Sequence, residues 1–85
     1  MKLFLTQSAN VGHAKAYLLA ETFRAAAQKN NVSIVDNAAD ADLVLVFGSS
    51  FPYNPAFVGK KVFIVGENIA MVSPEVTLAH ALANG

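Results

Sequence analysis

Residues Leu3 to Lys29 constrain the fold more than any other stretch, because they form a strand, a short loop and a long helix in succession. Leu3 to Leu5 are a continuous apolar run, which is typical of a strand covered on both faces. The small, polar loop that follows opens directly into an alanine-rich helix. A helix that begins in this way points free backbone N–H groups and the positive end of its dipole at the loop. This loop is therefore the first candidate for a binding site.

The helix has one small, apolar face and one polar face at about 100° per residue. Small side chains on the apolar face would let the helix lie close against a sheet. We expect Lys29, Asn30 and Asn31 to close the helix, with an asparagine in a left-handed cap. The predicted buried arc comprises Gly12, Ala16, Leu19, Ala20, Phe23, Ala26 and Ala27, and the predicted exposed arc comprises His13, Tyr17, Glu21, Arg24 and Gln28.

Three further apolar runs predict strands, at Val32 to Val35, Leu43 to Phe47 and Val62 to Val65. Strands that alternate with helices favour an α/β fold with a parallel sheet and helices on its faces. Parallel crossovers usually need about a dozen residues or more, yet only Asp36 to Asp42 join the second and third strands. We therefore expect this linker to run extended or to make a single turn, which leaves one face of the sheet thinly covered.

The C-terminal part predicts a helical turn at 67–72 and then a longer helix. Ser73, Pro74 and Glu75 form a strong helix start, with a hydroxyl at the N-cap, proline at the first position and an acid next. Asn84 and Gly85 are predicted to close this helix. The apolar stripe is predicted to comprise Val76, Ala79 and either Leu82 or Ala83.

Composition excludes several classes of function. The chain has 85 residues, which favours one domain at 1–85, and 54% of them are hydrophobic, so a packed core is expected. The net charge is zero, which provides no basic surface for nucleic acid. Without cysteine there is no disulfide, thiolate nucleophile or cysteine metal site, and Asp40 and Asp42 lack a third metal ligand. We therefore predict no metal and no cofactor, and no apolar run is long enough to span a membrane.

Ligands of open parallel sheets bind beyond the carboxyl ends of the strands, where three loops are expected to meet. Those loops are Thr6 to Asn10, Gly48 to Pro55 and Gly66 to Met71. Their hydroxyl and amide side chains suit hydrogen bonds to an oxyanion. Alternatively, they are turn and cap residues, with Ser8 or Asn10 capping the long helix. The residues in question are Gln7, Ser8, Asn10, Ser49 and Ser50.

The start of the long helix adds two candidate residues. His13 lies in its first turn, where it is either an anion contact or general acid–base group, or an ordinary surface histidine. Gly12 would let the helix start approach another backbone closely. Leu18 lies outside the buried arc, where it is either flank packing, which we favour, or part of a contact strip. His80 is interpreted as a surface residue. The glycine-rich nucleotide-binding motifs are absent, since N-V-G-H matches neither G-x-G-x-x-G nor a P-loop.

The chain resembles the IIB domain of the fructose-type sugar phosphotransferase system along nearly its whole length. That family carries a loop C-P-T-G-I-A-H-T after its first strand, where this chain has Q-S-A-N-V-G-H-A from Gln7. The run A-D-L-V-L-V from Ala41 is similar to the family's A-D-V-V-I strand entry, and F-V-G-K-K-V-F from Phe57 is similar to its F-x-G-K-x-V-Y turn. The P-E-x-x-L helix from Pro74 matches as well. The resemblance implies a Rossmann-like or flavodoxin-like three-layer fold with a small open four-stranded sheet of order 2-1-3-4.

The departures from the family bear directly on function. The family's loop cysteine, which is the phosphorylated nucleophile, is replaced by Gln7, and the next proline is replaced by Ser8. An amide cannot carry a phosphoryl group, and no other cysteine can substitute. Fructose-type permeases often carry two IIB-like domains ahead of the membrane IIC domain, and the first lacks the cysteine. This chain resembles that first, duplicated domain.

The resemblance implies a non-catalytic docking module on the cytoplasmic side of a bacterial inner-membrane fructose transporter. Its expected partners are an IIA or HPr-like phosphoryl donor and the IIB and IIC domains of the same chain. Two alternatives remain, which are a phosphoryl carrier that uses His13 or Ser8, and a structural or dimerisation spacer. The expected phosphate and partner contacts are Gln7, Ser8, Ala9, Asn10, Val11, Gly12 and His13, with secondary contacts from Tyr17, Ser49 and Ser50.

Overall fold

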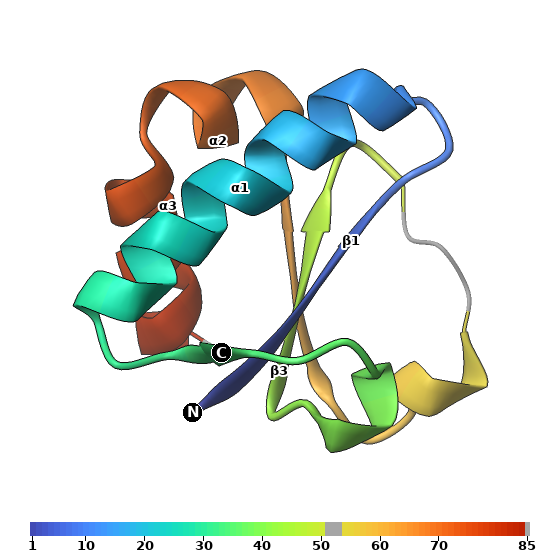
Figure 1. The fold of residues 1–85 in the computed structure, drawn as a ribbon. Coiled ribbons are helices and arrows are strands. Elements are labelled where there is room, and N and C mark those ends of the chain that lie inside the picture. The colour runs from blue at the N-terminus through green and yellow to red at the C-terminus, as the bar shows by residue number, and fades with distance from the viewer. Residues whose placement is uncertain (51–53, 85) are drawn as a thin grey trace.

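The four apolar runs form one parallel sheet in the computed structural model, which describes residues 1–50 and 54–84. Its strand order is β2-β1-β3-β4, so the parallel arrangement and the predicted order are confirmed (Figure 1). Strand β3 has the predicted bounds, whereas β1 runs further than predicted and β2 is shorter. The strands are β1 (Lys2–Gln7), β2 (Ser33–Ile34), β3 (Leu43–Phe47) and β4 (Lys61–Val65).

The three longer strands end together at one edge of the sheet. Gln7 pairs with Phe47, and Phe47 pairs with Val65, and each is the last residue of its strand. The backbone N–H of Ser8 donates to the carbonyl of Phe47 at 2.9 Å, and the N–H of Gly48 donates to Val65 at 2.8 Å. The loops after β1, β3 and β4 therefore leave the sheet side by side.

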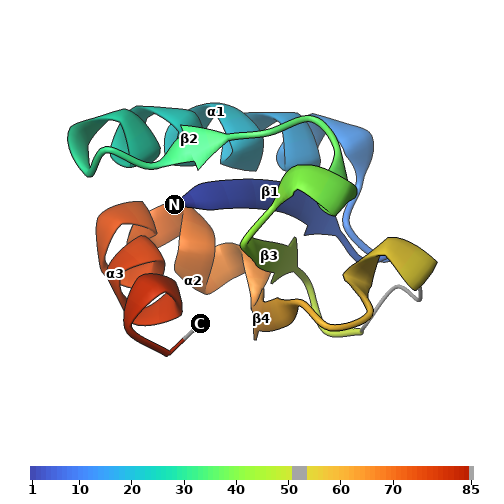
Figure 2. The ribbon, with the colours of Figure 1, turned by 90° about the horizontal axis from the view of Figure 1, so that it is seen from below.

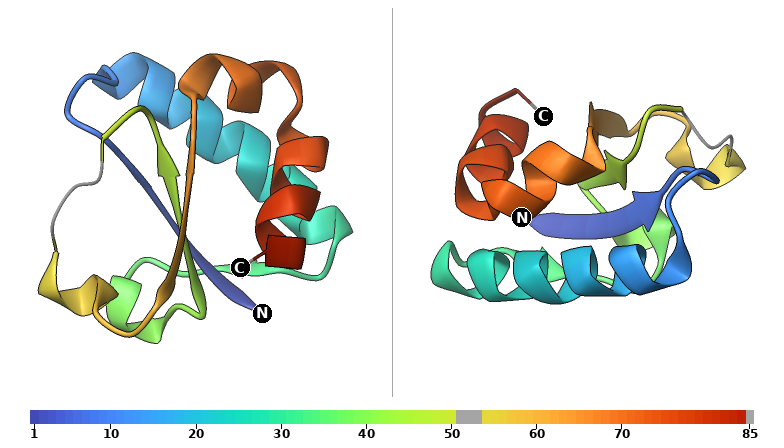
Figure 3. Two further views of the ribbon diagram at one scale, coloured as in Figure 1. Left: turned by 180° about the vertical axis from the view of Figure 1, so that it is seen from behind. Right: turned by 90° about the horizontal axis from the view of Figure 1, so that it is seen from above.

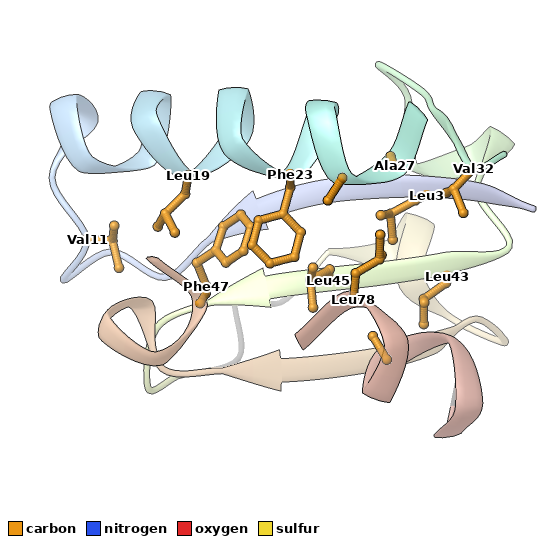
Figure 4. Packing of buried hydrophobic residues seen from close by; sticks show 13 residues of the cluster. Leu3, Val11, Leu19, Phe23, Ala27, Val32, Leu43, Leu45, Phe47 and Leu78 are labelled. Atoms are coloured by element: carbon orange, nitrogen blue, oxygen red, sulfur yellow. The ribbon is translucent and has the colours of Figure 1, made fainter. Parts of the chain in front are cut away.

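Helix α1 (His13–Lys29) covers one face of the sheet. The side chains that it packs against the sheet come from its later turns and belong to the predicted buried arc. Leu19, Phe23, Ala26 and Ala27 are buried, and the rings of Phe23 and Phe47 meet edge to face at 5.0 Å between centroids (Figure 4). The buried arc is shorter than predicted, because Gly12 is exposed at the N-terminal end of the helix. Leu18 is 55% exposed, so its interpretation as flank packing was wrong.

The end of α1 forms the predicted asparagine cap. Asn31 has a left-handed backbone with φ 56°, and its N–H donates to the carbonyl of Gln28 at 3.5 Å. The N–H of Val32 donates to the carbonyl of Ala27 at 2.9 Å, and both side chains are buried. This double hydrogen bond with its apolar contact is a Schellman motif, which turns the chain back into β2.

Helices α2 (Glu67–Val72) and α3 (Pro74–Asn84) pack on the same face of the sheet as α1 and complete the main core. The predicted helical turn and the predicted start at Pro74 are confirmed. The predicted face of α3 was wrong at Val76 and Ala79, which are exposed, whereas the predicted Leu82 packs against the core. The buried residues of α3 are Thr77, Leu78 and Ala81, whereas Val76 is 59% exposed. The predicted closure at Gly85 lies outside the described residues.

Two single turns cover the opposite face of the sheet as a thin third layer (Figure 2). The short crossover between β2 and β3 forms the 3-10 turn η1 (Ala38–Asp40), so it makes a single turn, which is one of the two arrangements expected. A second 3-10 turn, η2 (Pro55–Phe57), lies beside it. Phe57 packs against Phe4 at 6.3 Å between ring centroids. Lys60 Nζ donates to the carbonyls of Ala39 at 3.1 Å and Ala41 at 2.9 Å. The predicted thin cover is therefore present, and a lysine from the turn before β4 holds it in place.

Candidate functional site

The candidate site lies at the carboxyl edge of the sheet, where the loop after β1 leads into α1. Ser8 is the first residue of this loop and is only 1% exposed. Its hydroxyl donates to the side-chain carbonyl of Asn10 and lies 3.4 Å from the carbonyl oxygen of Phe47. Ser8 therefore holds the loop against β3 with both its backbone and its side chain, and its hydroxyl does not face the solvent.

Gly48 makes this arrangement possible, and the prediction from sequence missed its importance. Its backbone has φ +130°, which favours glycine, and a Cβ atom there would lie 1.8 Å from the hydroxyl oxygen of Ser8. The same Cβ atom would lie 3.2 Å from a methyl group of Val11. The position of Gly48 directly after the buried run L-V-L-V-F was the available signal. This glycine lets the first and second loops lie in direct contact.

Gly12 is the N-cap of α1, with φ −67° and ψ 157°, and no side chain of residues 1–50 and 54–84 caps the helix by a hydrogen bond. The expected capping by Ser8 or Asn10 is thus wrong. The expected close approach at Gly12 is also wrong, because a Cβ atom there would meet nothing within 4 Å. The part of the chain that the structure describes thus provides no side-chain acceptor for the first N–H groups of α1, an arrangement that favours an anion.

The predicted contact residues divide into a buried and an exposed group. Ser8 and Val11 are buried and Gln7 is half-buried at the end of β1, so these three hold the loop in place. The exposed group lies around the start of α1. Tyr17 is one helical turn after His13, and Ser49 and Ser50 directly follow Gly48, the residue that lies against Ser8. The exposed members are Ala9, Asn10, Gly12, His13, Tyr17, Ser49 and Ser50.

The site contains few charges among the described residues. Helix α1 has no acidic residue in its first turn. Lys15 Nζ donates to the side-chain carbonyl of Asn68 at 2.6 Å and thereby joins α1 to α2. Within residues 1–50 and 54–84, no cluster of three His, Asp or Glu side chains could hold a metal ion. The arrangement can offer hydrogen-bond donors to an anion, and it presents no buried acid–base pair.

None of the helices in the described part of the chain has the length and apolar character needed to cross a membrane.

Comparison with known proteins identifies relatives over the whole chain. Residues 1–85 match the family described as the N-terminal domain of the fructose-specific EIIB'BC component of the PTS system. The PTS system fructose-specific EIIB'BC component of Haemophilus influenzae is 79% identical over 100% of this chain and 15% of the relative. The component of the same name from Escherichia coli is 38% identical over 95% of this chain and 14% of the relative. The chain thus spans about one seventh of these curated relatives.

Solved structures share the fold at low sequence identity. A domain of the fructose-specific IIABC component of Borrelia burgdorferi superposes with a TM-score of 0.80 at 20% identity, covering 99% of this chain and 95% of that domain. The solution structure of an uncharacterised protein superposes with a TM-score of 0.75 at 21% identity, covering 98% of this chain and 92% of that one. These two neighbours support the α/β architecture and the sheet order.

Proposed function

Because this chain belongs to the family of N-terminal domains of fructose-specific EIIB'BC components, we propose that it is a non-catalytic IIB-like module that docks a phosphoryl-donor protein. The donor is an IIA or HPr-like partner, and the process is phosphoenolpyruvate-dependent fructose uptake. The module binds the donor without accepting its phosphoryl group. It acts on the cytoplasmic side of a bacterial inner-membrane transporter, whose IIB and IIC domains follow in the same chain.

One observation carries this proposal, which is the uncapped start of α1 at the carboxyl edge of the sheet. The phosphoryl group on a donor histidine is an anion, and helix N-termini bind anions through free N–H groups and the helix dipole. Asn10 and His13 flank this helix start and are exposed, so both can contact a docked protein. The loop therefore has the polarity of a phosphoryl-binding site.

The same loop offers no good acceptor for the phosphoryl group. Gln7 stands where the resembling family has its nucleophilic cysteine, and an amide does not form a phosphoryl intermediate. Ser8 is buried, and its hydroxyl is engaged with Asn10. This burial counts against Ser8 as a carrier, because nucleophilic serine needs access to the donor and an adjacent base. His13 is exposed and is the residue that a carrier function would have to use.

A binding module without chemistry still benefits the transporter. Docking raises the local concentration of the phosphorylated donor near a catalytic domain tethered to the same chain, and short tethers give effective concentrations in the millimolar range. The expected consequence is a lower KM of the transporter for its donor protein, with little change in kcat.

The test is an NMR titration of the ¹⁵N-labelled chain with the IIA domain, combined with mass spectrometry after incubation with phosphoenolpyruvate and the general phosphotransferase proteins. We expect shifts that cluster at residues 9–17 and no phosphate adduct. The double variant Asn10→Ala/His13→Ala should weaken IIA binding about tenfold or more, as expected for loss of 1.4 kcal/mol. His80→Ala is the matched control, since it removes the other histidine from the distant helix α3.

The outcomes separate the alternatives. A phosphate adduct would overturn the non-catalytic proposal, and its position would identify His13 or Ser8 as a carrier. Unchanged affinity of the double variant would overturn the assignment of the site. Absence of both adduct and shifts, with self-association in sedimentation, would favour a structural spacer.

A further inference from the structure

Three large aliphatic side chains are exposed together on α2 and the first turn of α3. Ile69 is 65% exposed, Val72 is 83% exposed and Val76 is 59% exposed. Ile69 and Val76 line a groove of about 310 Å³ whose inner wall includes Phe63 and Val65 of β4. Val72 borders the adjoining groove, which shares Ile69 with the first. We call this surface the α2–α3 groove, defined by Phe63, Val65, Ile69, Val72, Val76 and His80.

The position of the groove follows from the way α3 packs. Leu78 and Ala81 face the sheet, so Val76 and Ala79 on the same helix face outward. Strand β4 lies at the edge of the sheet and runs beside these two helices (Figure 3). The helix thus has apolar residues on its inner and its outer face, whereas a helix that only packs on a sheet needs one apolar face.

The chemistry of the groove indicates an uncharged partner surface. The lining also includes Asn68, Ser73 and Thr77, and none of the lining residues is acidic or carries a permanent positive charge. Contiguous exposed apolar surface on a small soluble domain typically marks an interface with another protein surface. A strongly charged partner would lose its hydration here without gaining an ion pair.

The length and the names of the relatives point to one occupant of the groove. This chain spans 15% and 14% of the two curated relatives, and its family is one of N-terminal domains. In such a longer protein, the polypeptide beyond residue 85 continues from α3, the helix whose outer face lines the groove. The next domain would therefore be tethered to the helix that forms one wall of the groove, and a tethered partner needs only modest affinity to dock.

We infer that the α2–α3 groove is the docking surface for the IIB domain that follows this one in the full-length protein, through an aliphatic surface on that domain. This inference rests on family membership and on the groove, and it goes beyond the docking of a phosphoryl donor. Lys15 and Asn68 join the start of α1 to α2. A domain seated on α2 would consequently hold the donor-binding loop at a fixed place relative to the catalytic domain.

The test uses cysteine accessibility, since these 85 residues contain no cysteine. Val72→Cys introduces a thiol into the groove. Val58→Cys is the matched control, because Val58 is 75% exposed in the turn between η2 and β4. Each variant is labelled with a maleimide in the 85-residue chain and in the full-length transporter in membrane vesicles, and the labelling rate of the specific peptide is measured by mass spectrometry.

We expect Val72→Cys to be labelled at least roughly tenfold more slowly in the full-length protein than in the 85-residue chain. The rate at Val58→Cys should be similar in both. Equal rates at Val72→Cys in both proteins would overturn the inference, as would the same protection at Val58→Cys. Protection of Val72→Cys within the 85-residue chain that grows with concentration would also overturn it, because the occupant would then be a second copy.

A photoreactive crosslinker attached to Val72→Cys identifies the occupant directly. Crosslinked peptides from the following IIB domain support the inference, and crosslinked peptides only from the membrane domain overturn it. This experiment contains no phosphoryl donor, so its result is independent of the IIA titration. If the donor binds the loop but the groove remains accessible in the full-length protein, the proposed function is supported and only the inference about the groove is overturned.

Discussion

Ser8 and Gly48 lie so close that a Cβ atom on the glycine would fall 1.8 Å from the hydroxyl oxygen of the serine. They are the first residues after β1 and β3, respectively. Adjacent parallel strands that end in register bring the loops that follow them together. Because Gly48 in the loop after β3 has no side chain, there is room for the side chain of Ser8 from the loop after β1. The geometry of the loop between β1 and α1 thus depends on a residue 40 positions away in the chain.

Replacement of Gly48 by alanine should destabilise the fold by about 3–5 kcal/mol. The new methyl group would collide with Ser8 and Val11, and the backbone at φ +130° would be strained for any residue with a Cβ atom. Urea unfolding of Gly48→Ala measures the loss. Gly12→Ala is the control, for which we expect less than about 1 kcal/mol, because its Cβ atom would meet nothing within 4 Å. Similar midpoints for the two variants would contradict the described contact.

The Ser8→Pro variant restores the residue of the resembling IIB loop and should nevertheless destabilise this chain. Proline has no N–H, so the hydrogen bond from Ser8 to the carbonyl of Phe47 at 2.9 Å would be lost in a buried place. We expect Ser8→Pro to lower the free energy of unfolding by about 1–3 kcal/mol more than Ser8→Ala does, because the alanine variant keeps the backbone N–H. Thermal unfolding followed by circular dichroism compares the two variants. Equal stability would show that this backbone hydrogen bond contributes nothing measurable.

The cap of α1 provides a test that compares three residues at one position. Asn31 has φ 56°, so Asn31→Ala should lower the free energy of unfolding by about 1 kcal/mol. Asn31→Gly should be at least as stable as the natural chain, because glycine adopts this conformation without strain. In guanidinium unfolding, the glycine variant should therefore be at least as stable as the chain with Asn31, and the alanine variant should be the least stable of the three. A more stable alanine variant would contradict the left-handed cap.

Removal of the Lys60 ammonium group should loosen the thin layer over the second face of the sheet. Lys60→Met keeps the apolar stem and removes the hydrogen bonds to Ala39 and Ala41. Since Lys60 is partly exposed, we expect a modest loss of about 1–2 kcal/mol, with faster hydrogen exchange at the amides of Asp40 and Ala41. Lys2→Met is the control, because it removes an exposed lysine from the start of β1. Unchanged exchange in η1 would refute this role for Lys60.

The features that were predicted correctly depend on residues near one another in the sequence. Strand β3 is a run of five apolar residues and has the predicted bounds. The cap at Asn31 was visible as two asparagines after a lysine. The turn η1 is one of the two arrangements that the short linker Asp36 to Asp42 predicted.

The features that could not be predicted depend on packing between distant residues. The sequence V-T-L-A-H-A-L-A from Val76 has small or apolar residues on nearly every side, so its pattern did not determine which side of α3 meets the sheet. The turn at Ser73 and the packing of α2 decide this, and they bury Thr77 in place of Val76. The burial of Ser8 depends in the same way on the glycine that follows a different strand.

The two edges of the sheet differ in length and character. Strand β2 has two residues, whereas β4 has five, with the sequence K-V-F-I-V. A short edge strand offers little backbone to a foreign strand, while a longer apolar edge is a template for unwanted strand addition. Of the two edges, β4 is therefore the one that a foreign strand could extend more readily. If the proposed docking on the α2–α3 groove is correct, the docked domain would lie next to β4 and would limit the access of foreign strands to this edge.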